Sequence, residues 1–530
     1  MQAKSSMYKV KHYPGLKVLR RICAITFLLF SLISHAQQIN YVATEIAREI
    51  GGPVILEDLT GDALLDLVNT RYNSEFGREL LIYEQQADGR FSSAPRPVEI
   101  KTEIIAVGFA DLRASPGKEL LLIASNGVFS LSSLINEYSG NLKPLLQWPL
   151  IADMPNQERV QFFQAVQDID QDGLVDLLLP GRNGYGYFKG AEGETFVAAT
   201  EFSTRNELLD PDLRPRGDAR LSADIDINSR DGIRLEVQAT QPGFFEGFVD
   251  DWHDTDAASD TLLDAETFIP PAVTADFNGD SRPDIAFLNV GLDLRGQINL
   301  LFQNQAGDFP ATPDWQGPID TRGDITLADI DGDALMDIVK LTGDGNDWDL
   351  YLYQNNAGRF NFDTPTQILR FSGYDVTPNF LDIDADGKPE LSVSYYTIPV
   401  VEAIRNTSIV RTQLIYATNN DEDQGIFARR PSSRLDETFS ADNVRGLAEQ
   451  MSLRHDIDGD GKLDALYITA EGTLAARHID TDFTILEQPF WQYTPNRSIS
   501  GFFVTSLNGD SVPDLVLRHN SAVTLLVANP

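Results

Sequence analysis

Cysteine is almost absent from this chain, which has one, Cys23, among its 530 residues. Cys23 lies inside the apolar N-terminal run described below, so the chain after residue 36 has none. Disulfide bonds, thiol catalysis and cysteine–zinc sites are therefore excluded there. A protein without these covalent staples needs another source of rigidity, and bound metal ions are a natural candidate.

Basic residues are also scarce, with 42 Lys and Arg against 79 Asp and Glu and a formal net charge of −37. A surface of this sign repels phosphate backbones and anionic lipids, so we expect no nucleic-acid partner. The excess carboxylates either keep the protein soluble or bind divalent cations. Their spacing, described below, favours cations.

Histidine is the third scarce residue. The four histidines after residue 36 are scattered, and none belongs to a recognisable metal or nucleophile motif: His253, His455, His478 and His519. His455 adjoins an acidic loop, where we interpret it as packed or solvated. A carboxylate pair for glycoside hydrolysis cannot be selected among so many acids. The sequence therefore predicts no catalytic residue.

Long apolar runs are missing except at the N-terminus, where Ile22 to Ile33 form a run of twelve residues. This run is too short to span a bilayer, follows several Lys and Arg residues, and precedes the small-x-small motif Ser34–Ala36. The pattern predicts a signal peptide over residues 1–36 and export to the periplasm, the cell surface or the medium. An uncleaved anchor is the alternative. Because no later stretch reaches about 18 apolar residues, we expect no integral membrane segment after cleavage.

A repeated acidic loop is what the sequence has in abundance. The loop has nine positions, with oxygen-bearing side chains at positions 1, 3, 5 and 9. Six near-complete copies begin at Asp58, Asp168, Asp276, Asp329, Asp382 and Asp456. Three degenerate copies begin at Asp111, Asp224 and Ser506. The copies recur about every 53 residues, a period typical of propeller blades of the kelch length.

Short apolar runs flank these loops, for example Ala272–Ala275 before one loop and Ile285–Leu288 after it. A second hairpin often follows, as from Leu350–Tyr353 to Phe360 through a turn containing Asn and Gly. Such turns need the positive φ that Asn and Gly tolerate. Each unit therefore carries about four strands, which is one propeller blade. The sequence predicts an all-β chain with little helix, folded over residues 37–530 as a β-propeller of seven to nine four-stranded blades.

The two ends of the repeat array are incomplete in complementary ways. The last unit ends at Val523–Val527 without a fourth strand, whereas Ile39–Ile50 form a spare strand before the first loop. Pairing them would close a ring and remove exposed sheet edges. An open solenoid, or two domains divided in the long step after Asp382, are the alternatives. Residues 245–268 and 417–450 are polar, and we expect them to be surface insertions.

The loop spacing itself predicts a metal site. Ca²⁺ takes six to eight oxygen ligands, and carboxylates at alternate positions converge when a loop curls. Glycine at position 6 would permit the sharp turn, and the acid at position 9 would close the far side. An EF-hand would need Glu at position 12, where Leu179 or Val393 stands here. Magnesium prefers a stricter octahedral geometry with bound waters, so Ca²⁺ is the expected ion.

The nine-position loops, the apolar strands ahead of them and the Tyr-x-Asn-x-Ala-Gly-x-Phe hairpins resemble the FG-GAP/VCBS repeat group, which includes the β-propeller of integrin α subunits. The resemblance covers Ile39 to Pro530. It implies several Ca²⁺ ions in the loops that join the first two strands of each blade, and it leaves metal at Asp111, Asp224 and Ser506 undecided. The implied ligands are Asp58, Thr60, Asp62 and Asp66; Asp168, Asp170, Asp172 and Asp176; Asp276, Asn278, Asp280 and Asp284; Asp329, Asp331, Asp333 and Asp337; Asp382, Asp384, Asp386 and Glu390; and Asp456, Asp458, Asp460 and Asp464.

These features predict an exported calcium-binding propeller, with calcium mainly structural, that binds a protein or glycan at the cell surface as an adhesion module. One alternative is a polysaccharide lyase or hydrolase on the same scaffold, because related propellers occur in such enzymes. A lyase would need a basic groove, which this acidic chain does not favour. The other alternative is a scaffold subunit of an envelope assembly.

Two further motifs have plain structural interpretations. The tripeptides Arg216–Asp218 and Arg322–Asp324 read Arg-Gly-Asp, and each precedes a loop Asp by a similar distance. We expect strand-entry turns there, with receptor adhesion as the alternative. Lone tryptophans belong to the core more often than to sugar-stacking surfaces. Trp252, which lies among acids, is the best candidate for an exposed one.

Overall fold

The computed structural model describes most of the chain between residues 40 and 529. The residues it leaves out within that span are 50–53, 114–115, 133–137, 139, 141, 151–156, 164–165, 182–183, 205–232, 235–271, 291–294, 344, 399–407, 420–424, 441–449 and 511. The predicted signal peptide, the Asp224 loop, Arg216–Asp218, Trp252 and His253 lie outside the described residues.

Strands of the described residues form eight sheets, and the chain passes through the sheets in order. The first four sheets contain β2 (Ile55–Glu57), β3 (Asp66–Asn73), β4 (Gly77–Tyr83) and β5 (Arg96–Ile100); β6 (Ile104–Ala110), β7 (Glu119–Ala124), β8 (Gly127–Leu131) and β9 (Lys143–Gln147); β11 (Val166–Gln167), β12 (Asp176–Gly181), β13 (Gly184–Ala191) and β14 (Thr195–Ser203); and β16 (Ala272–Ala275), β17 (Asp284–Val290), β18 (Arg295–Leu301) and β19 (Trp315–Asp320).

The other four sheets complete the ring. They contain β20 (Asp324–Ala328), β21 (Asp337–Gly343), β22 (Asp347–Tyr353) and β23 (Gln367–Ser372); β24 (Tyr374–Leu381), β25 (Glu390–Thr397), β26 (Ser408–Tyr416) and β27 (Ser433–Ser440); β28 (Ser452–His455), β29 (Asp464–Ile468), β30 (Leu474–His478) and β31 (Trp491–Tyr493); and β32 (Gly501–Thr505), β33 (Asp514–His519), β34 (Ala522–Asn529) and β1 (Asn40–Ala47).

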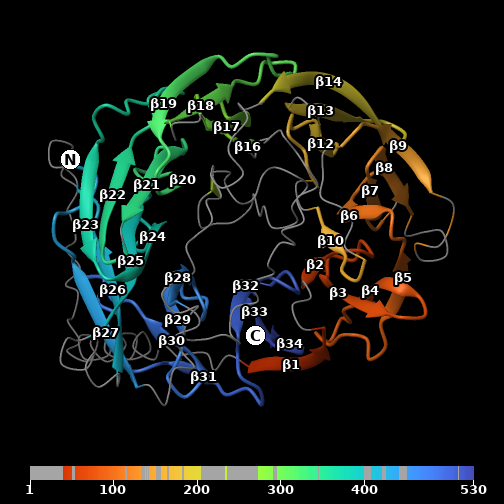
Figure 1. The fold of residues 1–530 in the computed structure, drawn as a ribbon. Coiled ribbons are helices and arrows are strands. Elements are labelled where there is room, and N and C mark those ends of the chain that lie inside the picture. The colour runs from red at the N-terminus through yellow and green to blue at the C-terminus, as the bar shows by residue number, and fades with distance from the viewer. Residues whose placement is uncertain are drawn as a thin grey trace, which may run out of the picture.

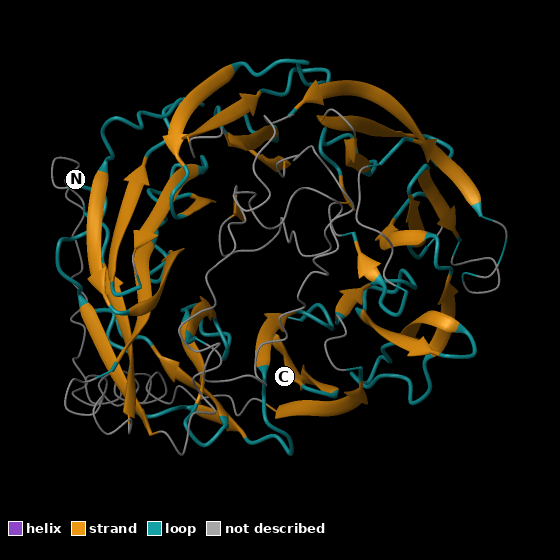
Figure 2. Ribbon diagram, in the orientation of Figure 1, coloured by secondary structure: helices purple, strands orange, loops and turns teal. Residues whose placement is uncertain are grey.

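Each sheet is an antiparallel meander of four strands, and the eight sheets stand around a ring as the blades of a β-propeller (Figure 1). Two blades gain a short extra strand, since β10 (Gln161–Phe162) pairs with β6 and β15 (Ile233–Arg234) pairs with β20. The described residues are strands, turns and loops without a helix (Figure 2), and they hold no helix able to cross a membrane. The predicted all-β propeller is confirmed, with eight blades among the described residues.

The ring closes through the two ends of the repeat array. β1 pairs antiparallel with β34 from Asn40 opposite Asn529 to Ala47 opposite Ala522, so it supplies the strand that the last blade lacks. The Arg48 side chain then donates a 2.8 Å hydrogen bond to the carbonyl of His519. This closure confirms the predicted pairing and excludes the open solenoid, because both would-be edges are satisfied.

The hydrophobic core lies between the blades. Eight clusters of buried residues each combine side chains of two neighbouring blades. The second strand of a blade is buried on both faces, as in β7, whereas the outermost strand alternates, as in β19. Fully buried strands explain the short continuous apolar runs of the sequence. The described tryptophans Trp148, Trp315, Trp348 and Trp491 pack against these clusters, as expected of core residues.

One predicted insertion is wrong in part. Residues 433–440 of the polar segment 417–450 form β27, the outermost strand of a blade, with an alternating burial pattern. Every second residue of such a strand is polar and faces solvent. The composition of the segment therefore resembles that of a loop, and the strand was not predicted. The long step after Asp382 is thus one blade with long strands, and no domain boundary lies there.

The meander gives the propeller two distinct faces. The face that carries the connections between the first and second strands of each blade, such as residues 58–65, is called here the loop face. Connections between the second and third strands, and from one blade to the next, lie on the opposite face. Arg322 and Gly323 form one of these inter-blade turns, and Asp324 starts β20, as predicted for a strand-entry turn.

Candidate metal centres

Each acidic loop is curled around the carboxylate at its first position. In all six near-complete loops, the backbone N–H of position 6 donates to Oδ2 of the first Asp, at 2.7–3.0 Å. The backbone takes positive φ at position 6, and also at position 4. Each of these loops has a glycine at one or both positions, as at Gly61, Gly173 and Gly387, because glycine adopts positive φ without strain. The sequence predicted the turn at position 6 and missed the one at position 4.

The acid at position 9 is the first residue of the second strand, and it is buried in every described blade. Its carboxylate accepts a hydrogen bond from the backbone N–H of position 2, as from Ile330 to Asp337 at 2.9 Å. Its other oxygen accepts a second backbone N–H in several blades, as from Asn355 to Asp337 at 2.6 Å. The eight acids, all at most 2% exposed, are Asp66, Glu119, Asp176, Asp284, Asp337, Glu390, Asp464 and Asp514.

Burial dominates the electrostatics of these acids. Desolvation, reinforced by nearby carboxylates, raises the pKa of Asp337 to about 8 and the pKa values of Asp284 and Glu390 to about 7. Burial also raises the pKa of Asp333, and the neighbouring carboxylates Asp331 and Asp329 raise it further. A cation placed among these groups would favour their charged forms, so the loops are electrostatically suited to bind one.

Four loops bring three carboxylates to within 4.8 Å of one another. The groups are Asp168, Asp170 and Asp176; Asp329, Asp331 and Asp333; Asp382, Asp384 and Glu390; and Asp456, Asp458 and Asp464. Asp172, Asp386 and Asp460 stand at position 5 of these loops, and Asp337 stands at position 9 of its own. Hard oxygen donors in this number are what Ca²⁺ prefers, so the residues fit the predicted ion.

The remaining near-complete loops have a neutral oxygen at position 3. Thr60 replaces the acid among Asp58, Asp62 and Asp66. In the other loop, Asn278 donates from Nδ2 to Asp284 at 3.4 Å, and Arg282 forms an ion pair with Asp280. These two loops offer fewer carboxylates to an ion than the four above.

A Lys or Arg side chain of the protein itself also lies close to an acid in two other units, those of Asp168 and Asp111. Lys189 Nζ lies 3.2 Å from Oδ2 of Asp170, which belongs to one of the six near-complete loops. In the degenerate Asp111 unit, the Arg113 side chain lies 3.7 Å from Glu119. Lys189 is not evident from the loop spacing, because it comes from a different strand, whereas Arg113 stands at position 3 of its own unit.

Residues 274–339 match the family model described as FG-GAP-like repeat. This segment holds the loops at Asp276 and Asp329, and the other blades repeat their spacing, strand order and buried ninth-position acid. This chain is a β-propeller of FG-GAP-like repeats. No curated protein matches its sequence.

Solved structures similar to the FG-GAP propeller share little sequence with it. An Agrocybe aegerita lectin, described as recognising non-reducing terminal N-acetylglucosamine, is 14% identical over 89% of this chain and 98% of its own, with a TM-score of 0.38. An exotype rhamnogalacturonan lyase, YesX, is 13% identical over 93% of this chain and 74% of its own, with a TM-score of 0.30. The Photorhabdus luminescens Tc holotoxin pore is 13% identical over 91% of this chain and 20% of its own, with a TM-score of 0.25.

The acidic loops of the FG-GAP propeller also join neighbouring blades, which the sequence did not reveal. The Gln303 side chain donates a 2.9 Å hydrogen bond to the carbonyl of Ile169, position 2 of the loop in the preceding blade. At the closure of the ring, the backbone N–H of Leu65 donates to the carbonyl of Leu507 at 3.1 Å. An ion that fixed one loop would therefore also stabilise the contact with the next blade.

Proposed function

We propose that this FG-GAP propeller is an exported Ca²⁺-binding module that binds a protein or glycan at the cell surface, with Ca²⁺ acting mainly as a structural staple. The observation that carries the proposal is the convergence of three carboxylates within 4.8 Å in each of four loops on one face. Export rests on the N-terminal charge and hydropathy pattern, and N-terminal sequencing of the mature protein tests it.

A structural role for the ion follows from how the loops are held. Position 1 and position 9 are fixed by backbone N–H groups, and position 2 is linked to the next blade. Ion binding to such a preformed loop adds its free energy to folding, because the unfolded chain does not hold the ligands together. The chain also lacks disulfides after residue 36, so such staples would replace them.

The opposite face is the better candidate for ligand binding. The longest connections between blades start and end at strand ends on this face. Examples are the connections from β14 to β16 and from β27 to β28. Tyr72 and Phe76 lie at the β3–β4 turn on the same face and are 41% and 54% exposed. Binding residues concentrate on loops that a rigid scaffold holds in place.

Calorimetry with Ca²⁺ on the chelator-treated protein tests the metal part of the proposal. We expect uptake of several ions, and a melting temperature that rises with Ca²⁺ and falls again with EDTA. Mg²⁺ at equal concentration is the control, and it should stabilise less. Absence of Ca²⁺ uptake, or an unfolding curve unmoved by EDTA, would remove the basis of the proposal.

Ligand binding is tested with glycan arrays and with pull-down from envelope extracts. We expect Phe76→Ala and Tyr72→Ala to weaken capture, whereas Leu142→Ala, at an exposed site on the loop face, should leave it unchanged. Assays on acidic polysaccharides are run in parallel. Turnover there would assign the protein to the enzyme class instead of the binding class.

A further inference from the structure

In three blades, one position at or next to the third strand faces the metal loop from outside it. In the blade of β28 to β31, His478 is directly opposite the ninth-position acid, Asp464, in the pairing of β29 with β30. Continuing the register one residue past Leu177–Phe188 and Ile338–Tyr353 places Lys189 and Gln354 at the same position of their blades. We call this the cross-strand position. It carries Lys, Gln or His in three blades whose loops each bring carboxylates together.

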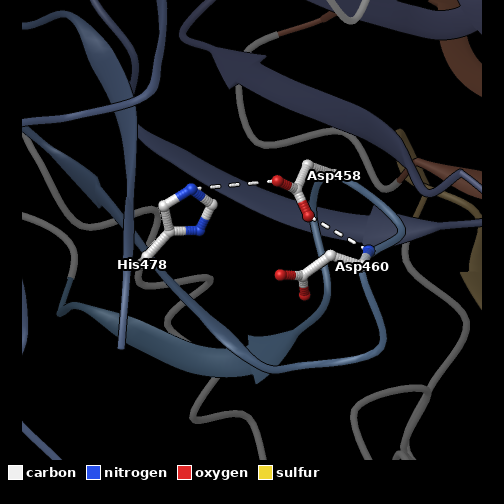
Figure 3. A group of neighbouring side chains, drawn as sticks. All are labelled: Asp458, Asp460 and His478. Carbon is white, nitrogen blue, oxygen red and sulfur yellow. Dashed lines mark hydrogen bonds and ion pairs between the residues drawn. The ribbon is translucent and has the colours of Figure 1, made fainter. Parts of the chain in front are cut away.

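All three side chains contact the acid at position 3 of their loop. Lys189 Nζ lies 3.2 Å from Asp170, and Gln354 Nε2 donates to Asp331 at 2.6 Å. His478 Nε2 lies 3.9 Å from Oδ2 of Asp458 (Figure 3). The repeated fold thus aims a different chemical group at the same carboxylate: an ammonium, an amide and an imidazole.

The His478 ring is held in one orientation. Its Nδ1 lies 3.1 Å from Oδ1 of Asp464, a buried carboxylate whose other oxygen accepts the backbone N–H of Ile457 at 2.8 Å. The ring also stacks on Phe490, with centroids 4.1 Å apart and planes 12° apart. Because Oδ1 of a carboxylate accepts hydrogen bonds, Nδ1 carries a proton, and the ring turns Nε2 toward Asp458.

When the imidazole is neutral, its Nε2 lone pair faces the Asp458 carboxylate, and a cation bound between the two groups would stabilise this arrangement. Asp458, Asp460 and His478 (Figure 3) each offer one ligand atom, and these three atoms lie within 4.8 Å of one another. A carboxylate that holds Nδ1 while Nε2 binds the metal is the usual outer-shell arrangement of histidine ligands. Imidazole nitrogen favours first-row transition ions over Ca²⁺, which prefers oxygen.

The geometry points to a mixed nitrogen–oxygen site for a divalent transition ion of the Zn²⁺ class, formed by His478 Nε2 with the carboxylates of Asp458 and Asp460. Asp464 is the positioning residue that orients the imidazole. The inference uses the FG-GAP loop geometry, and it holds whether or not the other loops take up Ca²⁺.

Spectroscopy with Co²⁺, a visible probe for zinc sites, tests this assignment on the whole protein. We expect visible d–d absorption in the wild-type protein that Zn²⁺ abolishes and excess Ca²⁺ does not. His478→Gln, which keeps a polar side chain of similar reach, should weaken Zn²⁺ binding at least about tenfold. Gln354→His should create a second Co²⁺ signal at the matching position of its blade. Equal Zn²⁺ affinity in the wild type and His478→Gln would overturn the inference.

A measurement on the unmutated chain covers the case in which His478→Gln fails to fold. Histidine ¹⁵N NMR should show one Nδ1-protonated ring whose Nε2 resonance shifts when Zn²⁺ is added. If no histidine resonance responds, the imidazole forms only an ion pair with Asp458 and the inference falls. Ca²⁺ calorimetry on the same samples separates this result from a failure of the proposed calcium function.

Discussion

The side chain of Asn355 reaches across a blade boundary, and its Nδ2 donates a 2.9 Å hydrogen bond to the carbonyl of Phe277. Phe277 is position 2 of the loop in the preceding blade, and its own N–H is bonded to the ninth-position acid, Asp284. The equivalent contact one blade earlier joins Gln303 to Ile169. A metal loop and a blade interface are therefore one hydrogen-bonded unit.

Replacing Asn355 by Ala should expose how much this unit contributes to stability. The substitution leaves the carbonyl of Phe277 and the N–H of Gly358 without their partner, and both contacts are buried. Buried groups left unpaired cost about 1–3 kcal/mol, and we expect a loss of that size in urea unfolding. Asn356→Ala, at the exposed neighbouring position, is the matched control and should change stability by less than about 0.5 kcal/mol. Equal effects of both variants would contradict the inter-blade role.

Two acids of one loop should respond differently to removal of charge. Asp337→Asn places an amide where two backbone N–H groups donate, so it should cost roughly 2–3 kcal/mol with or without Ca²⁺. Asp333→Asn, at an exposed position, should leave the metal-free protein nearly unchanged and reduce the Ca²⁺-dependent rise in melting temperature. Thermal unfolding with Ca²⁺ and with EDTA checks both. A purely Ca²⁺-dependent effect of Asp337→Asn would show that this residue acts only as a ligand.

The metal-free protein should become less stable as pH rises from about 4 to about 8. Burial raises the pKa of Asp337 to about 8, of Glu390 to about 7 and of Asp66 to about 6, each above its unfolded value. Such groups contribute stability below the unfolded pKa, and this contribution is lost as pH passes the folded pKa. Burial lowers the pKa of His519, which acts in the opposite direction.

Melting temperatures in EDTA across this pH range measure the effect. Ca²⁺ should restore more stability at pH 8 than at pH 5, because it binds the charged form of the carboxylates. Metal-free stability that instead rises steadily over the same range would show that the buried acids keep their charge at no cost.

The loop at Asp168 should gain affinity for Ca²⁺ when its internal cation is removed. Lys189 Nζ lies 3.2 Å from Asp170 and 2.9 Å from Asp308, so it competes with any ion that uses Asp170. Lys189→Gln gives this loop the cross-strand residue found at Gln354. We expect at least about tenfold tighter binding at one site by calorimetry. Lys101→Gln, which removes an exposed charge paired with Glu99, is the control. Unchanged binding in Lys189→Gln would mean that the ammonium does not occupy the ion's position.

Much of the fold could be predicted because its signals are local. Each Asp-rich loop lies within a few residues of its apolar runs and its turn glycines. This whole pattern recurs about every 53 residues. The complementary ends, Val523–Val527 and Ile39–Ile50, were enough to predict closure through β1 and β34. β27 was missed because an outer strand with alternating polar residues has the composition of a loop.

For the candidate site, the sequence predicted the acids of each loop but not the groups that surround and hold them. Spacing alone gave Asp168, Asp170 and Asp176 as neighbours, and the structure brings them together. Spacing could not show that Asp176 is buried, with backbone N–H groups bonded to its carboxylate, because a ligand and a structural acid look alike in a sequence. A signal did exist in the acid retained by the degenerate units, such as Glu119, where the metal pattern is otherwise lost.

The sequence by itself determined the repeat, the strand-loop-strand unit and the positions of the oxygen donors, because each depends on side chains close together along the chain. Only the tertiary structure decided which residue faces each loop from the neighbouring strand, and which loop touches the next blade. Lys189 and His478 lie more than ten residues from their loop acids. The register of antiparallel pairing, set by packing between blades, is what brings them there.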